Sequence, residues 1–271
     1  MRGKRTLTLF GTIIAAASAN AWGATQDPTE LLARARQALG LDSHAKGIVT
    51  LVSTGEFTKV GDSRAPSPKT GEMAPADSIG KIRLTFRLPD AFRQDYAYTV
   101  LGKLPGPIFI TCRDGDTIWL DNRLPQPMPT GTSISVDPPP EPDAGRRRSI
   151  LFLHARYLLA LILYTTPSFP IAFTYAGSTG TSDSRGVALD GRGPQGFEAR
   201  LVLDQKTFRP LMLSYAESGI TRELRLDGYE NSSGILFPHQ VTLMQGGNVK
   251  EVLRLKKFEL NSQVPSQDFH K

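Results

Sequence analysis

The sequence predicts a mainly β protein with helices: an open, strongly curved antiparallel half-barrel wrapped around an apolar helix, with an amphipathic helix before it. Two features of the sequence predict this class. Apolar and polar residues alternate along many short segments, and one helical segment is apolar on nearly every side. Each strand then has a dry face that needs a cover, and the apolar helix needs a shelter from water.

The chain opens with an export signal. Basic residues in the first five positions precede an apolar run from Leu7 to Ala17, and Ala19-Asn20-Ala21 offers a small-residue cleavage site. The apolar run is too short for a membrane span, so we expect no anchor. We therefore predict a cleaved signal peptide over residues 1–23, a single domain over residues 24–271, and a periplasmic location.

Charge and cysteine content narrow the class further. The signal carries three of the 32 basic residues and none of the 26 acidic ones, so the mature chain has a net charge of (32 − 3) − 26 = +3. This small excess does not predict a nucleic-acid partner. The one cysteine, Cys112, excludes an internal disulfide, so stability must come from burial.

A short helix begins the mature chain. Asp27 precedes Pro28 as an N-cap, apolar residues follow at helical spacing from Leu31 to Leu39, and Gly40 ends the pattern.

From Gly47 the period changes to two, most clearly over residues 81–88, where each even position is apolar. The change of parity near Lys256 and Lys257 predicts a β-bulge. Turns are predicted at Asp114-Gly115, Gly191 to Gly193 and Gly246-Gly247-Asn248. The other predicted strands are residues 91–100, 108–113, 117–120, 197–203, 211–215, 223–229, 237–244 and 249–260.

Two stretches are predicted to be flexible loops from their proline, glycine and polar content, namely residues 60–79 and 125–145. After the second loop and the triple arginine 146–148 comes the apolar segment, predicted as a helix over residues 149–164 that Ser149 caps and Pro167 ends. Exposing some ten large apolar side chains of this segment to water would cost about 15 to 30 kcal/mol of free energy. His154 and Arg156 interrupt the segment, so we expect no transmembrane span. The helix either fills the core or covers a cavity as a lid.

Three stretches resemble the LolA/LolB family of periplasmic lipoprotein carriers. Residues 80–93 look like that family's pair of strands joined at a Pro, residues 110–125 like its next hairpin with a Trp in the second strand, and residues 258–269 like its final strand and tail. The resemblance covers essentially the whole mature chain and implies an open half-barrel around lid helices over a hydrophobic cavity. In the lipoprotein-shuttling carrier an arginine directly before the Pro latches the lid, whereas this sequence has Leu88 there, and Arg87 should point to the opposite face. The receptor-like branch carries a lipidated N-terminal Cys, which this sequence lacks.

No catalytic, metal or cofactor motif is present: the four His have no ligand spacing, and no nucleophile elbow, P-loop or dinucleotide fingerprint occurs. His154 and Cys112 are each predicted to be buried and structural. The sequence therefore favours a non-enzymatic carrier for a lipid or acylated protein, with a membrane-bound donor or acceptor protein as a candidate further partner. The alternative is a protein-interaction or envelope-sensing module on the same fold. Candidate ligand-binding residues are Leu84, Phe86, Phe92, Phe109, Trp119, Leu153, Tyr157, Leu161, Leu213, Tyr215 and Leu243.

Overall fold

The structure is a computed structural model of the whole chain. It describes residues 26–42, 47–66, 73–100, 104–124, 139–181, 184–217 and 219–271. The predicted export signal lies outside the described residues.

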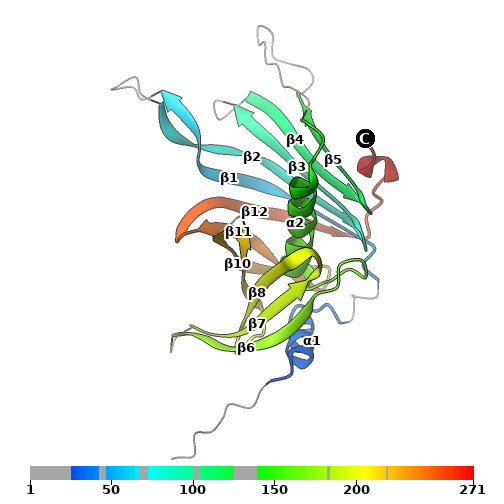
Figure 1. Cartoon of the computed structure of the whole chain (residues 1–271), viewed down its shortest axis with the longest axis vertical. Helices are drawn as coiled ribbons and strands as arrows, with labels where there is room; N and C mark the ends of the chain where they lie inside the picture. The colour runs from blue at the N-terminus through cyan, green and yellow to red at the C-terminus, as the bar shows by residue number, and fades with distance from the viewer. Residues whose placement is uncertain are drawn as a thin grey trace, which may run out of the picture.

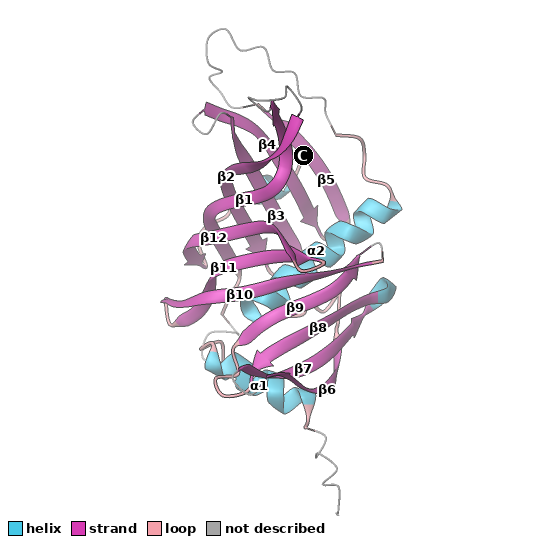
Figure 2. Ribbon diagram, turned by 90° about the vertical axis from the view of Figure 1, so that its left-hand side faces the viewer, coloured by secondary structure: helices cyan, strands magenta, loops and turns pink. Residues whose placement is uncertain are grey.

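The described strands form one antiparallel sheet of twelve, in the order β5-β4-β3-β2-β1-β12-β11-β10-β9-β8-β7-β6, with β5 and β6 as open edges. The sheet curves strongly, as Figures 1 and 2 show. This confirms the predicted open half-barrel. The strands are β1 (Thr50–Pro66), β2 (Met73–Arg87), β3 (Ala91–Val100), β4 (Leu104–Asp114), β5 (Thr117–Arg123), β6 (Ala172–Thr181), β7 (Ser184–Gly193), β8 (Phe197–Asp204), β9 (Pro210–Glu217), β10 (Ile220–Ser232), β11 (Ile235–Gln245) and β12 (Asn248–Leu260).

Helix α2 (Ala144–Ile162) lies inside the curve and crosses the strands (Figures 1 and 2). All residues from Ala155 to Leu163 are buried, as expected for a helix sheltered by the concave side of the sheet. The predicted start at Ser149 is wrong. Asp143, six residues before Ser149, caps the helix by accepting a hydrogen bond from the Arg146 amide, and the helix ends at Ile162 because Leu163 adopts a left-handed conformation.

Helix α1 (Pro28–Ala38) begins at the predicted cap: the Asp27 carboxylate accepts a hydrogen bond from the Thr29 amide. It lies near β6 at one end of the sheet (Figure 1). Arg36 in its last turn donates two hydrogen bonds, of 3.2 and 3.1 Å, to the carbonyl oxygen of Leu163. These bonds satisfy a carbonyl at the C-terminal end of α2, which the helix itself leaves unpaired.

The predicted bulge is present in β12. Thr54 pairs with Lys257 and Gly55 with Leu255, so Lys256 is the extra residue. The predicted turns at Asp114-Gly115 and Gly246-Gly247 are also present, with positive φ at these glycines.

The predicted loop over residues 60–79 is wrong at both ends. Residues 60–66 belong to β1 and residues 73–79 to β2, while residues 67–72 lie outside the described part. Among the described residues, the parts of the two strands beyond Lys59 and before Gly80 pair only with each other. Prolines are tolerated there because the missing N–H is not needed by a second neighbour. Of the predicted loop 125–145, residues 125–138 are not described, and Ala144 and Gly145 already belong to α2.

Strands β6 and β7 were not predicted, and Gly191 to Gly193, predicted as a turn, end β7. Their glycine, serine and threonine content hides the alternation. The turn to β8 is the short 3₁₀ segment Pro194–Gly196. A second 3₁₀ segment, Ser266–Phe269, follows β12 and packs beside β3 and β4.

Candidate functional site

A cavity of about 450 Å³ lies between α2 and the concave face of the sheet. Its size falls within the range of about 300 to 1,000 Å³ that is usual for small-molecule sites. The strands that line it come from both halves of the sheet, namely β1, β3, β4, β9, β10, β11 and β12.

One stripe of α2 faces this cavity. It consists of Arg146, Ser149, Ile150, Leu153 and the pair Arg156-Tyr157. The spacing of three or four residues places these side chains along a single helix face. The helix side of the cavity is therefore basic at both ends of the stripe and apolar between them.

The sheet side of the cavity is also mixed. Four aliphatic side chains belong to β10, β11 and β12: Leu224, Val241, Leu243 and Leu253. Near β3 and β4 the cavity is lined by Tyr96, Tyr98 and Phe109. There the Nζ of Lys59 lies 2.6 Å from the Tyr98 hydroxyl and 4.5 Å from the centre of the Tyr96 ring. The walls can thus enclose an apolar chain while charged groups remain at the edges.

Arg156 ties α2 to the β9 side. Its guanidinium lies 3.6 Å from the centre of the Tyr215 ring and 3.3 Å from a carboxylate oxygen of Glu217. Desolvation lowers the pKa of Arg156, while Tyr215 and Glu217 act in the opposite direction. A second arginine, Arg222, pairs with the other oxygen of Glu217 at 2.6 Å.

Tyr157 ties α2 to the other half of the sheet. Its hydroxyl accepts a hydrogen bond of 3.2 Å from the Gln94 amide on β3. Desolvation is the largest cause that raises the pKa values of Tyr157 and Tyr96 well above the ordinary value, so both phenols stay protonated.

His154 contacts β4 through Arg113, whose Nη1 donates to His154 Nδ1 at 2.7 Å. The imidazole is buried and stacks on Phe92 with ring centres 5.2 Å apart. Desolvation and then the Arg113 charge lower the pKa of His154 to about 3. An arginine from the sheet therefore does contact the helix, but from β4 rather than from the position before Pro89.

Arg87 points to the opposite face, as the alternation predicts. It pairs with Asp114 at 3.0 Å, and its guanidinium lies 4.7 Å from the centre of the Phe269 ring. These contacts belong to the convex side of the sheet, where the C-terminal segment packs.

The structure places the eleven predicted ligand-binding residues in three different environments. Five line the cavity: Phe109, Leu153, Tyr157, Tyr215 and Leu243. Five others are fully buried in the main core: Leu84, Phe86, Phe92, Leu161 and Leu213. The binding role itself stays a prediction for all of them.

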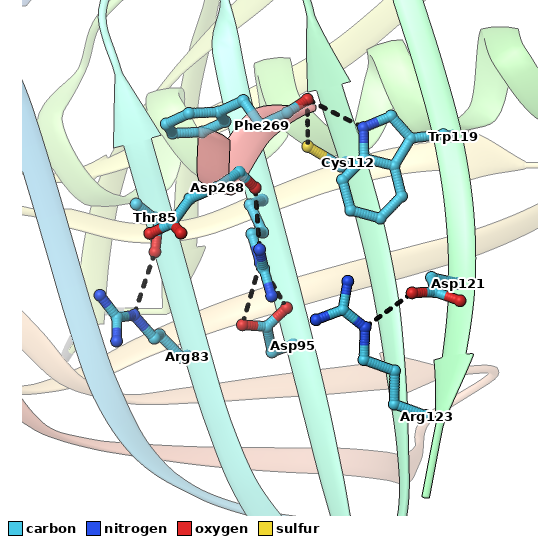
Figure 3. A network of polar contacts seen from close by, with 10 residues as sticks. Arg83, Thr85, Asp95, Cys112, Trp119, Asp121, Arg123, Asp268 and Phe269 are labelled. Atoms are coloured by element: carbon cyan, nitrogen blue, oxygen red, sulfur yellow. Dashed lines mark hydrogen bonds and ion pairs between the residues drawn. The ribbon is translucent and has the colours of Figure 1, made fainter. Parts of the chain in front are cut away.

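Trp119 lies apart from the cavity, in a small second cluster with Cys112 and Phe269. Figure 3 shows how the C-terminal segment is held there, with the Phe269 carbonyl accepting from Trp119 Nε1; the distance is 2.8 Å. Arg93 also donates to the Asp268 carbonyl at 2.8 Å. The sequence pattern could not separate this face from the inner one, because both carry aromatic residues on β5 and its neighbours. Cys112 is buried as predicted, and desolvation raises the pKa of its thiol to about 12.

The charged lining was missed by the sequence analysis. Lys59, Arg222, Glu217 and Glu251 sit in strands whose alternation marks one face as dry, and Arg146 stands in a run of three arginines. Only the helical spacing from Arg146 to Arg156 could have indicated that two basic residues share the face of Leu153.

In the part of the chain that the structure describes, no group of three or more His, Cys, Asp or Glu residues is placed to hold a metal ion. Neither described helix combines the length and the hydropathy needed to cross a membrane.

The fold and the cavity together define an open β half-barrel with a helix inside its curve. This architecture is similar to that of a LolA superfamily protein from Nitrosomonas europaea: 15% identity, coverage of 90% of this chain and 97% of that chain, and a TM-score of 0.53. A DUF1329 family protein from Desulfovibrio piger aligns over 90% of this chain and 98% of its own, with 10% identity and a TM-score of 0.50. A scan against protein-family models finds no match, and a search of curated proteins finds none. At identities this low the similarity shows the fold alone. The structural similarity confirms the LolA-like fold that the sequence predicts.

Proposed function

We propose that this protein is a periplasmic carrier or binding protein for a lipid or a lipid-modified protein. The observation that carries the proposal is the cavity of about 450 Å³ between α2 and the concave face of the sheet. The acyl part of the cargo lies along Leu153 of α2 and along Leu243 and Leu253 of the sheet.

The energetics favour an apolar chain in this place. Each methylene transferred from water to an apolar wall contributes about 0.8 kcal/mol to the binding free energy. The summed contribution of the methylenes of an acyl chain offsets the translational and conformational freedom that the cargo loses on binding. The polar groups at the edges of the cavity leave a wet exit for a head group or for the protein part of the cargo.

Native mass spectrometry of the protein purified from periplasm without detergent tests the proposal directly. We expect co-purifying lipid or acylated protein, together with saturable uptake of a fluorescent acyl probe. Persistent absence of both contradicts a carrier role. Crosslinking in cells tests the protein-interaction alternative, which a single stoichiometric protein partner with no bound lipid would favour.

A variant that fills the cavity gives the matched prediction. Leu243 is half-buried and lines the cavity, so Leu243→Trp should weaken acyl-probe binding about tenfold or more, since it removes room for roughly two methylenes at about 0.8 kcal/mol each. The control is Val249→Trp on the same hairpin. Val249 is 37% exposed and pairs with Met244, and the side chain of Met244 points away from the cavity. Equal probe affinity for the two variants would place the acyl chain elsewhere.

A further inference from the structure

The cavity lining carries more positive than negative charge. Four basic side chains line it, Lys59, Arg146, Arg156 and Arg222, against two acidic ones, Glu217 and Glu251. A cavity built only for an acyl chain has no need of this charge, because buried charge must be offset by partners.

Arg156 is the most enclosed of the four. Its side chain is 4% exposed, yet it stands in the middle of an apolar helix and faces the cavity. Within the described residues its Nε is buried without a hydrogen-bond partner, although Nη1 reaches Glu217. An enclosed guanidinium with an unused donor can still donate to a further anionic acceptor.

Arg222 shares the same carboxylate. Glu217 lies 3.3 Å from Arg156 and 2.6 Å from Arg222, so one negative charge faces two positive ones. The Nε of Arg222 is likewise buried and unpartnered among the described residues. The other acidic residue, Glu251, acts on Tyr96 and Tyr157, where it raises both pKa values in addition to desolvation.

Arg146 adds a third guanidinium to the lining. It is exposed, and it lies on the same helix stripe as Arg156, ten residues earlier. Ten residues correspond to about 15 Å along the helix axis, so Arg146 lies too far from Arg156 to share one small head group with it.

We propose that the cargo is an anionic amphiphile whose phosphate or carboxylate head group is bound by Arg156 and Arg222. Its acyl chain follows Leu153, Leu243 and Leu253. This inference rests on the proposed function and specifies the chemical class of the cargo. Arginine suits the role because its planar fork matches both anions and keeps its charge when enclosed.

The test compares three probes with the same chain, decyl phosphate, decanoate and decanol, in calorimetric titrations that keep each below its micelle concentration or, for decanol, its solubility limit. We expect decyl phosphate or decanoate to bind about tenfold or more tightly than decanol, as hydrogen bonds to charged groups allow. Which of the two anions binds more tightly identifies the head group. In Arg222→Gln this preference should shrink severalfold, while decanol binding stays unchanged.

Arg225→Gln provides the control, because Arg225 lies on the same strand as Arg222 with opposite parity and pairs with Glu223. It should keep the full preference. If the Arg156→Gln protein folds, its preference for the anionic probes should shrink as well; the conclusion rests on Arg222→Gln. Equal affinity for all three probes overturns the head-group inference and leaves the proposed function standing, whereas no binding of any probe contradicts both.

Discussion

His154 is kept in its neutral form inside the sheet. Its Nδ1 accepts a hydrogen bond from Arg113, so the ring proton resides on Nε2, and the ring is 1% exposed. Desolvation and the Arg113 charge lower its pKa to about 3 from an ordinary value of 6.5. The folded state therefore excludes a proton that the unfolded state accepts.

This difference predicts a pH dependence of stability. Between pH 6.5 and 3 the unfolded chain binds a proton at His154 and the folded chain does not, so the free energy of unfolding falls as the pH falls through this window. The loss amounts to about 1.4 kcal/mol per pH unit from this group, and to about 5 kcal/mol at most. Above pH 6.5 the contribution is fully present. Urea unfolding at pH 7.5, 5.5 and 4.5 measures it.

The comparison variant is His154→Gln, which keeps an acceptor for Arg113 and does not titrate. We expect it to be less stable at pH 7.5 but to lose less stability on acidification. His270→Gln, at a position 63% exposed, should behave as the unchanged protein. Parallel pH profiles for the wild type and His154→Gln would show that another group governs the acid sensitivity.

At the scale of elements, strict alternation is what made strands predictable. The pattern over residues 81–88 predicted β2, and the change of parity predicted the bulge at Lys256. Alternation failed in β6 and β7, where glycine and small polar residues break it, and in the outer parts of β1 and β2, where prolines indicated a loop. In each failure the pairing of neighbouring strands, which no local pattern contains, decides the structure.

The bulge also imposes a requirement on the facing strand. Gly55 pairs with Leu255 next to the extra residue, and a Cβ on Gly55 would lie 2.0 Å from the Arg254 carbonyl oxygen. Because that atom belongs to the backbone, the strand pair would have to separate. We therefore expect Gly55→Ala to lower the free energy of unfolding by more than about 2 kcal/mol, measured by urea unfolding.

Gly145→Ala is the matched control at the start of α2. Only a carboxylate oxygen of Asp143 lies near the added Cβ, at 3.4 Å, and alanine favours the helix by about 1 kcal/mol over glycine. This variant should be neutral or stabilised. A Gly55→Ala protein as stable as Gly145→Ala would mean that β1 and β12 can separate at the bulge without loss.

At the scale of the whole molecule, α2 connects the two halves of one continuous sheet. It contacts β3 and β4 through Tyr157 and His154, and it contacts β9 through Arg156. On the β8 side Phe152 packs edge-on against Phe197, with ring centres 5.2 Å apart. The apolar character of residues 149–164 predicted that the sheet would shelter this helix. The sequence did not indicate that one stripe of the helix borders a cavity, because that depends on how far the sheet curves.

The connection predicts that the halves unfold together. Leu158 is 1% exposed in the core around α2, so Leu158→Ala should lower the free energy of unfolding by about 2 to 5 kcal/mol. In a protein that starts at Ala24, Trp119 on β5 is the remaining one of the two tryptophans, and its fluorescence reports one edge of the sheet. Unfolding followed by this fluorescence and by far-ultraviolet circular dichroism should shift by the same amount, with coincident transitions. Leu104→Ala, at a position 42% exposed, should leave both transitions in place. Should the Leu158→Ala fluorescence transition stay at the wild-type midpoint while the dichroism transition moves, β3 to β5 would be an independently stable unit and α2 would not couple them to the rest of the sheet.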